Sequence, residues 1–94
     1  MPPKILVVDD NQDLCENLKD VFDSEGHDTT CVYDGYEAVR SVQRTTPEIV
    51  LLDMFMPGLD GLATFRQIAR LAPTARVIMM TGHIDETVGR PSNQ

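Results

Sequence analysis

Three short, uninterrupted apolar runs stand out along the chain: ILVV at 5–8, IVLL at 49–52 and VIMM at 77–80. Apolar runs of this length that are bounded by polar residues are typical of strands buried in a parallel sheet. A fourth segment, residues 29–33, contains Thr, Cys and Val and has moderate strand propensity. The pattern therefore predicts strands at 5–8, 29–33, 49–52 and 76–80.

Between these segments apolar residues recur at helical spacing. Residues 12–24 are predicted to form an amphipathic helix that ends before Gly26, with an apolar stripe of Leu14, Leu18, Val21 and Phe22. Asp34, followed by Glu37, predicts the start of a second helix, whose stripe is Ala38, Val39 and Val42. Asp60 predicts the start of a third helix, with Leu62, Phe65, Ile68, Ala69 and Leu71 on its apolar face.

The order of these elements is β-α-β-α-β-α-β, and residues 84–88 have the pattern of the first turn of a fourth helix. Helical crossovers between parallel strands are right-handed, so the helices should cover both faces of the sheet. We therefore predict an α/β, doubly wound parallel sheet. The 94 residues form one domain, 1–94, and the polar residues 89–94 are expected to be a flexible tail.

Polar side chains follow the predicted strands directly. Asp9 and Asp10 come after the first strand, Asp53 after the third and Thr81 after the fourth. The carboxyl ends of parallel strands meet at one edge of a sheet, where ligands bind. Crowded carboxylates repel one another unless a cation lies between them, and oxygen ligands favour Mg²⁺, with Mn²⁺ as a possible substitute. This edge is therefore a candidate metal site, with the backbone carbonyl of Phe55 as a further ligand.

The same arrangement suits chemistry on a phosphoryl group. A carboxylate can attack phosphorus to form an acyl phosphate when a cation neutralises the charge on the phosphoryl oxygens. Asp53 is the candidate nucleophile, and Thr81 could donate a hydrogen bond to a phosphoryl oxygen. Gly82 has no Cβ, so its backbone N–H can approach the same oxygens closely.

Composition excludes several other functions. The formal net charge of −7 disfavours contact with nucleic acid or anionic membranes, and no apolar run is long enough to span a bilayer. The amino-terminal residues lack the layout of a signal peptide, so we expect a cytoplasmic protein. Cys15 and Cys31 lack metal-binding spacing and are expected to be core residues, while His27 and His83 do not form a zinc pattern.

Three motifs, ILVVDD, LLDMFMPGLDG and VIMMTG, together resemble the response-regulator receiver domain of two-component signalling. The resemblance covers nearly the whole chain. It implies a flavodoxin-like sheet order of 2-1-3-4 and a signalling switch rather than an enzyme, since a receiver catalyses only its own phosphorylation and dephosphorylation. The implied phosphoryl donor is a sensor histidine kinase or a phosphotransfer protein.

The resemblance also implies roles for individual residues. Asp53 corresponds to the phosphoacceptor, Asp9 and Asp10 to the acidic metal residues, and Thr81 to the switch hydroxyl. Two further pairs are also implied: Pro57 and Gly61 shape the loop after the acceptor, and Phe55 and His83 tune hydrolysis of the acyl phosphate. Simpler interpretations remain: Asp9, Asp10 and Asp60 as helix caps or loop acids, and His83 as an exposed loop residue.

The chain departs from the family pattern at its carboxyl end. Only 13 residues follow Thr81, whereas a helix, a strand and a further helix need more than about 30. We therefore expect a truncated receiver without the fifth strand, its lysine and the fifth helix. Lys4 and Lys19 lie elsewhere, and Arg90 comes too soon to replace that lysine.

Two consequences follow from this departure. The fourth strand would be a sheet edge, so we expect a homodimer or oligomer formed through residues 77–80. The alternative to a working phosphoacceptor is then a dimerisation or sequestering module without a working switch. A phosphatase that forms an aspartyl phosphate would need a second Asp two residues after the nucleophile, where this chain has Phe55.

Overall fold

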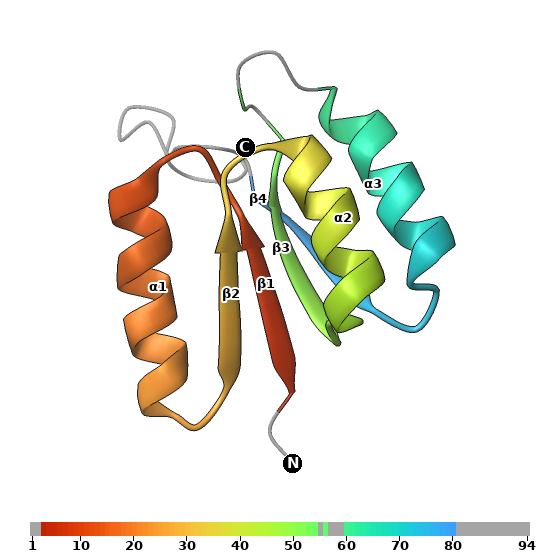
Figure 1. Cartoon of the computed structure of the whole chain (residues 1–94). Helices are drawn as coiled ribbons and strands as arrows, with labels where there is room; N and C mark the ends of the chain where they lie inside the picture. Colours follow the sequence, from red (N-terminus) through yellow and green to blue (C-terminus); the bar gives the residue numbers. More distant parts are fainter. Residues whose placement is uncertain (1–2, 55, 57–59, 81–94) are drawn as a thin grey trace, which may run out of the picture.

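A four-stranded parallel sheet forms the centre of the molecule (Figure 1). The structure is a computed structural model that describes residues 3–54, 56 and 60–80. The sheet order is β2-β1-β3-β4, as predicted. Its strands are β1 (Lys4–Val8), β2 (Asp28–Val32), β3 (Ile49–Asp53) and β4 (Arg76–Met80).

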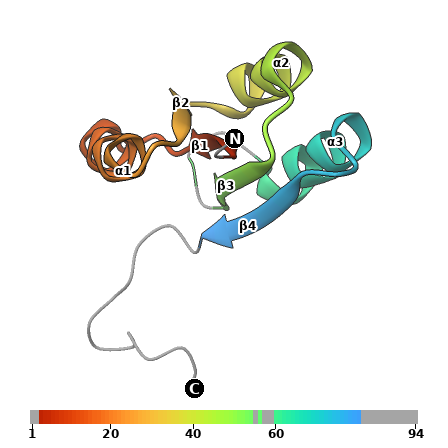
Figure 2. The ribbon, with the colours of Figure 1, turned by 90° about the horizontal axis from the view of Figure 1, so that it is seen from below.

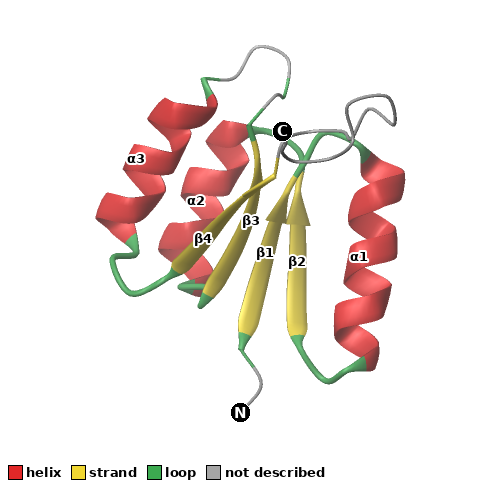
Figure 3. Ribbon diagram, turned by 180° about the vertical axis from the view of Figure 1, so that it is seen from behind, coloured by secondary structure: helices red, strands yellow, loops and turns green. Residues whose placement is uncertain are grey.

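Three helices connect these strands and cover both faces of the sheet. They are α1 (Gln12–Ser24), α2 (Gly35–Thr45) and α3 (Gly61–Leu71). Figure 2 shows α1 on one face and α2 and α3 together on the other, so the predicted doubly wound α/β fold is confirmed. Figure 3 shows the sheet from behind, with all four strands ending at the same edge.

Each helix begins at a side chain that accepts a hydrogen bond from a backbone N–H of the first turn. Asn11, Asp34 and Asp60 accept from the residue three positions on, at 3.0, 2.7 and 3.1 Å. Such caps satisfy donors that have no partner within the helix. The caps predicted at Asp34 and Asp60 are confirmed, whereas Asn11 caps α1, so the interpretation of Asp9 and Asp10 as caps is wrong. After α1, Gly26 has a φ of 93°, a conformation that glycine adopts without strain.

The strand alternation divides the core into two clusters. On the face covered by α2 and α3 the cluster is centred on Leu6, Val8, Val50 and Leu52. On the face covered by α1 it contains Ile5, Val7 and Cys15, with Cys31 and Leu51 packed against them. Cys15 is buried in the core, as predicted, whereas Cys31 is only partly buried beside it, and both are free thiols.

Some sequence predictions need correction. Val21 is 53% exposed, and Leu62 and Leu71 are 47% and 42% exposed, so their helical spacing did not make them core residues. The second strand begins and ends one residue earlier than predicted, because its register pairs Lys4 with Asp28 and Val8 with Val32. In the described part of the chain, no helix has the length and apolar character needed to cross a membrane. The predictions for residues 84–88 and 89–94 lie outside the described residues.

Candidate functional site

The sheet brings Asp9 and Asp53 to the same edge. Strands β1 and β3 are direct neighbours, with Val8 paired to Leu52, so the residues that follow this pair lie side by side. The Asp9 N–H donates to the Val32 carbonyl at 3.1 Å, and the Met54 N–H donates to the Met80 carbonyl at 3.0 Å. These bonds extend the ladders one residue past β1 and β3, and thus fix the backbone at both acids.

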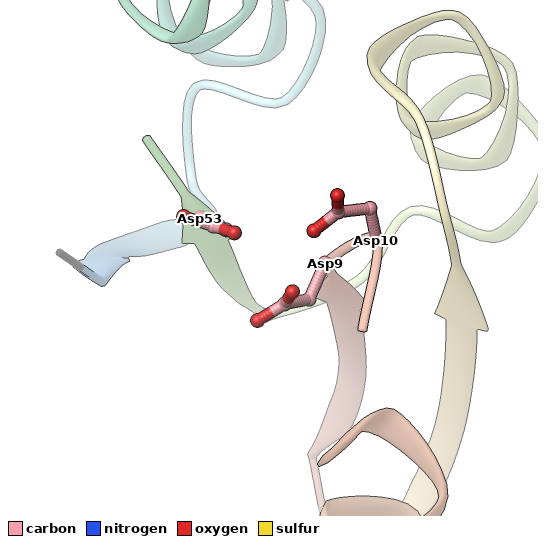
Figure 4. Close-up of side chains that lie close together, drawn as sticks. All are labelled: Asp9, Asp10 and Asp53. Atoms are coloured by element: carbon pink, nitrogen blue, oxygen red, sulfur yellow. The ribbon is translucent and has the colours of Figure 1, made fainter. Parts of the chain in front are cut away.

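Three carboxylates converge at this edge. Asp9, Asp10 and Asp53, which we call the acidic cluster, each offer one oxygen, and these oxygens all lie within 4.8 Å of one another (Figure 4). Asp9 is 2% exposed and Asp53 is 3% exposed, while Asp10 lies at the surface. Two buried acids and one exposed acid therefore form a site that opens to solvent on one side.

The surroundings of Asp9 disfavour its negative charge. Burial is the largest cause that raises its pKa, the Asn11 backbone N–H opposes this shift, and the nearby Asp53 and Asp10 raise the pKa further. Its Oδ1 accepts from the Asn11 N–H at 3.0 Å, and its backbone carbonyl accepts from the Cys15 thiol at 3.3 Å. Among the described residues, the buried Oδ2 has no hydrogen-bond donor.

These features fit a hard divalent cation. A buried oxygen without a donor is costly, and carboxylates this close repel one another. A cation among the three acids would relieve both effects, and a donor set made only of oxygens suits Mg²⁺ or Mn²⁺ rather than a thiolate-binding metal. The oxygen ligands of the three acids and the geometry of the cluster therefore indicate the same class of ligand, a hard divalent cation.

Gly61 lies very close to the residue that follows Asp53. A Cβ at this position would lie 3.0 Å from both the Cα and the carbonyl oxygen of Met54, and 3.1 Å from its sulfur. Because Met54 follows Asp53 directly, the start of α3 packs against the backbone that carries the acid. A side chain at position 61 would therefore require a shift of α3 or of Met54.

The structure places only part of the predicted site. Asp9, Asp10, Asp53 and Gly61 are brought together as described above. The other predicted residues lie outside the described residues: Phe55, Pro57, Thr81, Gly82 and His83. Sequence reasoning missed Asn11, which both caps α1 and donates to Asp9. Its place between an Asp pair and a helical pattern is a signal that could have identified the cap.

Two hollows of the described surface lie away from the acidic cluster. A pocket of about 270 Å³ lies between β2 and α2, and another of about 520 Å³ lies between α2 and α3. Neither pocket is lined by Asp9, Asp10 or Asp53.

The fold and the acidic cluster define the class of this protein: a flavodoxin-like α/β domain with an acidic site at the carboxyl edge of its sheet. The sequence pattern of the family described as the response regulator receiver domain matches residues 5–91. The chain therefore belongs to the response-regulator receiver domain family. This is a family of signalling domains rather than classical enzymes, and its members bind Mg²⁺ through acidic residues and interact with histidine kinases or phosphotransfer proteins.

Solved structures agree with this assignment. NtrX from Brucella abortus, crystallised in complex with ATP, is 35% identical with a TM-score of 0.81; the match covers 88% of this chain but only 19% of that one. A two-component response regulator of the LuxR family from an Aurantimonas species is 28% identical, with a TM-score of 0.77 and coverage of 93% and 64%. A CheY-like receiver domain from Methanospirillum hungatei shares the fold, with a TM-score of 0.83 at 22% identity, and is covered to 68%.

Proposed function

We propose that this chain is a receiver that accepts a phosphoryl group on Asp53, from a sensor histidine kinase or a phosphotransfer protein, in a reaction that depends on Mg²⁺. The observation that carries the proposal is the acidic cluster, in which three carboxylate oxygens lie within 4.8 Å of one another. The buried Asp9 Oδ2, which has no hydrogen-bond donor among the described residues, supports it, because a bound cation would compensate for the missing donor.

In the proposed step, a carboxylate oxygen of Asp53 attacks the phosphorus of a phosphohistidine. The P–N bond breaks as the new P–O bond forms, and the released histidine nitrogen takes a proton from solvent. The product is an acyl phosphate on Asp53. Burial of the acceptor at 3% exposure, beside a backbone fixed by the Met54–Met80 bond, holds its oxygen at the open edge of the sheet.

Asp9, Asp10 and Asp53 would hold the metal, which supplies positive charge beside the phosphoryl oxygens when bound. Mn²⁺ could take the same place because it also prefers oxygen ligands. The Phe55 carbonyl is proposed as a further ligand, while Thr81 and Gly82 contact the phosphoryl oxygens. Pro57 shapes the loop together with Gly61, and Phe55 and His83 set the rate at which the domain hydrolyses its own acyl phosphate. Within this proposal the reaction takes place in the cytoplasm.

Phosphorylation by acetyl phosphate tests this function. Incubation with Mg²⁺ should add one phosphoryl group to the wild-type chain, detected by intact-mass spectrometry and lost on treatment with hydroxylamine. Asp53→Asn should gain none, and Asp60→Asn serves as a matched control because Asp60 caps α3 outside the acidic cluster. Equal labelling of the wild-type and Asp53→Asn proteins, or labelling that persists in EDTA, contradicts the proposal.

A second candidate function is self-association without a working switch. It is favoured by β4, where Ile78 and Met79 are each 48% exposed at an edge of the described sheet. An apolar edge strand is a template for pairing with another chain. Size-exclusion chromatography with light scattering should show a homodimer or oligomer, and a monomer at all concentrations up to the millimolar range would contradict this candidate.

A further inference from the structure

Two thiols lie together on the side of the sheet that α1 covers. Cys15 comes from α1 and Cys31 from β2, and both belong to the cluster that contains Ile5 and Val7. The Cys31 thiol donates to the Cys15 carbonyl at 3.2 Å, although 16 positions separate the two residues along the chain. The two thiols also lie within hydrogen-bond reach of each other. The fold thus brings together the two cysteines of the chain.

A second hydrogen bond connects this pair to the acidic cluster. The Cys15 thiol donates to the backbone carbonyl of Asp9 at 3.3 Å. The Asp9 N–H donates to the carbonyl of Val32, the neighbour of Cys31, at 3.1 Å, and Asp9 Oδ1 accepts from the Asn11 N–H just before α1. A continuous path of contacts therefore runs from Cys31 through Cys15 to the backbone of Asp9.

The two thiols are protonated but differ in their exposure. Burial is the main cause that raises the pKa of Cys15 to about 12, and burial also raises the pKa of Cys31. Both S–H bonds are therefore intact in the reduced protein at neutral pH. Cys15 is buried, whereas Cys31 is only partly buried. A dissolved reagent therefore meets Cys31 first.

We propose that Cys15 and Cys31 form a reversible disulfide within one chain, and that this disulfide weakens metal binding by the acidic cluster. The oxidant is a low-molecular-weight disulfide such as oxidised glutathione. The Cys31 sulfur attacks one of its sulfurs, which leaves a mixed disulfide and releases one small thiol. The Cys15 sulfur then attacks the Cys31 sulfur and releases the second small thiol. The two cysteine protons pass to the released thiolates, so the protein loses two electrons and the small disulfide gains them.

The disulfide would change the support of Asp9. Oxidation removes both S–H donors, so the Asp9 carbonyl loses its bond from Cys15 and the Cys15 carbonyl loses its bond from Cys31. A covalent S–S bond is also shorter than a hydrogen-bonded contact, so it draws the first half of α1 toward β2. An S–H···O bond is weak, so we expect Mg²⁺ affinity to fall by about two- to fivefold rather than to disappear. This coupling rests on the proposed function, in which Asp9 is a metal ligand.

Peptide mapping tests whether the disulfide forms. The folded wild-type protein is incubated with oxidised glutathione until its composition is constant, and the remaining thiols are then alkylated. After digestion with trypsin, residues 5–19, which contain Cys15, should be joined to residues 20–40, which contain Cys31. The intact protein should keep the mass of one chain. Absence of the joined peptides, or their presence only in covalent dimers, would refute the disulfide.

The equilibrium with glutathione separates pairing that the fold imposes from random encounter in a flexible chain. Mixtures of reduced and oxidised glutathione give the effective concentration of one thiol at the other. This concentration should be at least about tenfold higher in the native protein than in concentrated urea, because the fold holds the two sulfurs together. The equilibrium is the better measure because protonated thiols react slowly. A native value equal to or below the value in urea would overturn the proposal.

Titration of Mg²⁺ into the oxidised and reduced proteins measures the coupling. Oxidised wild type should bind about two- to fivefold more weakly than reduced wild type, and dithiothreitol should restore the affinity. Cys31→Ser is the matched control, because its hydroxyl group keeps a donor for the Cys15 carbonyl but cannot form the disulfide. Its affinity should be the same before and after treatment with oxidised glutathione. Equal affinities of oxidised and reduced wild type, or an equal loss in Cys31→Ser, contradict the coupling.

These outcomes separate the present inference from the proposed function. If reduced wild type binds Mg²⁺ and is labelled on Asp53 by acetyl phosphate, but the joined peptides are absent, only the disulfide is refuted. If the joined peptides form with a raised effective concentration, but reduced wild type neither binds Mg²⁺ nor becomes labelled, the proposed function is refuted and the disulfide stands.

Discussion

Asp9 is the residue whose surroundings depart most from those of an ordinary aspartate. It is 2% exposed, its Oδ2 lacks a donor among the described residues, and two further carboxylates lie beside it. Burial and these neighbours raise its pKa above the usual 3.8. The metal-free protein therefore carries a local cost at neutral pH that a bound cation would remove.

A substitution of Asp9 should make this destabilisation by the buried carboxylate measurable. Because the pKa is raised, the folded state binds the proton more tightly than the unfolded chain does, and stability falls as pH rises from about 3.8 through the raised pKa. Asp9→Asn keeps an oxygen for the Asn11 N–H but removes the charge. At neutral pH in EDTA, urea unfolding should show this variant more stable than wild type by on the order of 1 kcal/mol.

The pH dependence supplies the check on this reasoning. The advantage of Asp9→Asn should shrink as pH is lowered toward 3.8, where the wild-type carboxyl group becomes protonated. At neutral pH, added Mg²⁺ should stabilise Asp9→Asn less than it stabilises wild type. A variant that is less stable than wild type in EDTA at neutral pH would mean that the Asp9 carboxylate is stabilising without metal.

For single residues, the sequence predicts which acidic side chains come together but not which contacts hold their backbone in place. Asp9 and Asp53 follow directly on apolar runs, and the parallel sheet then places them at one edge by topology alone. The thiol of Cys15 on the Asp9 carbonyl and the contact of Gly61 with Met54 depend on how helices pack against the sheet. No spacing in the sequence encodes those distances.

Among the elements, local signals located some boundaries and missed others. The bounds predicted for α1 and β4 are those observed, since helical spacing and Gly26 delimit the helix and polar residues flank the strand. The ends of β2 follow from its register with β1, which only pairing defines. Helical spacing also predicted too wide a buried face for α3. Leu62 and Leu71 are exposed, because no other described element covers them.

The contact between α3 and the end of β3 leads to a prediction for Gly61→Ala. The added Cβ would meet the Met54 backbone at 3.0 Å, so either α3 or Met54 must shift. We expect a loss of about 1–3 kcal/mol in unfolding free energy and weaker Mg²⁺ binding, since Met54 adjoins Asp53. Urea unfolding measures the loss of stability, and calorimetric titration measures the Mg²⁺ affinity.

A control separates the local effect of this substitution from general destabilisation. Val42→Ala removes buried volume from the core beneath α2, away from the acidic cluster, and should cost about 1–3 kcal/mol without changing Mg²⁺ affinity in the folded protein. If Gly61→Ala and Val42→Ala reduce Mg²⁺ affinity equally, the Met54 contact does not position Asp53.

Two residues of α1, Lys19 and Asp23, form a clamp on the edge of β2: the Thr29 N–H donates to Asp23 Oδ1 and the Thr29 carbonyl accepts from Lys19 Nζ. Lys19→Ala combined with Asp23→Ala frees the outward backbone groups of Thr29, so β2 becomes available for pairing with another chain. We expect light scattering to show larger species for this double variant than for wild type. An unchanged size distribution would show that the clamp does not protect β2.

At the scale of the whole molecule, the net charge of −7 and the acidic cluster act together. Every cation near this edge of the sheet is attracted both by the three local carboxylates and by the surplus of acidic side chains. Only a site with ordered oxygen ligands distinguishes a divalent ion from general screening by salt.

The most direct test of the acidic cluster as a phosphoacceptor site is a calorimetric titration of Mg²⁺ into wild type and Asp53→Asn at neutral pH and constant ionic strength. The wild-type protein should bind one ion in a saturable curve, and Asp53→Asn should bind at least about tenfold more weakly, because it loses one charged ligand of three. Indistinguishable curves for the two proteins, or no saturable binding by wild type, would contradict the account.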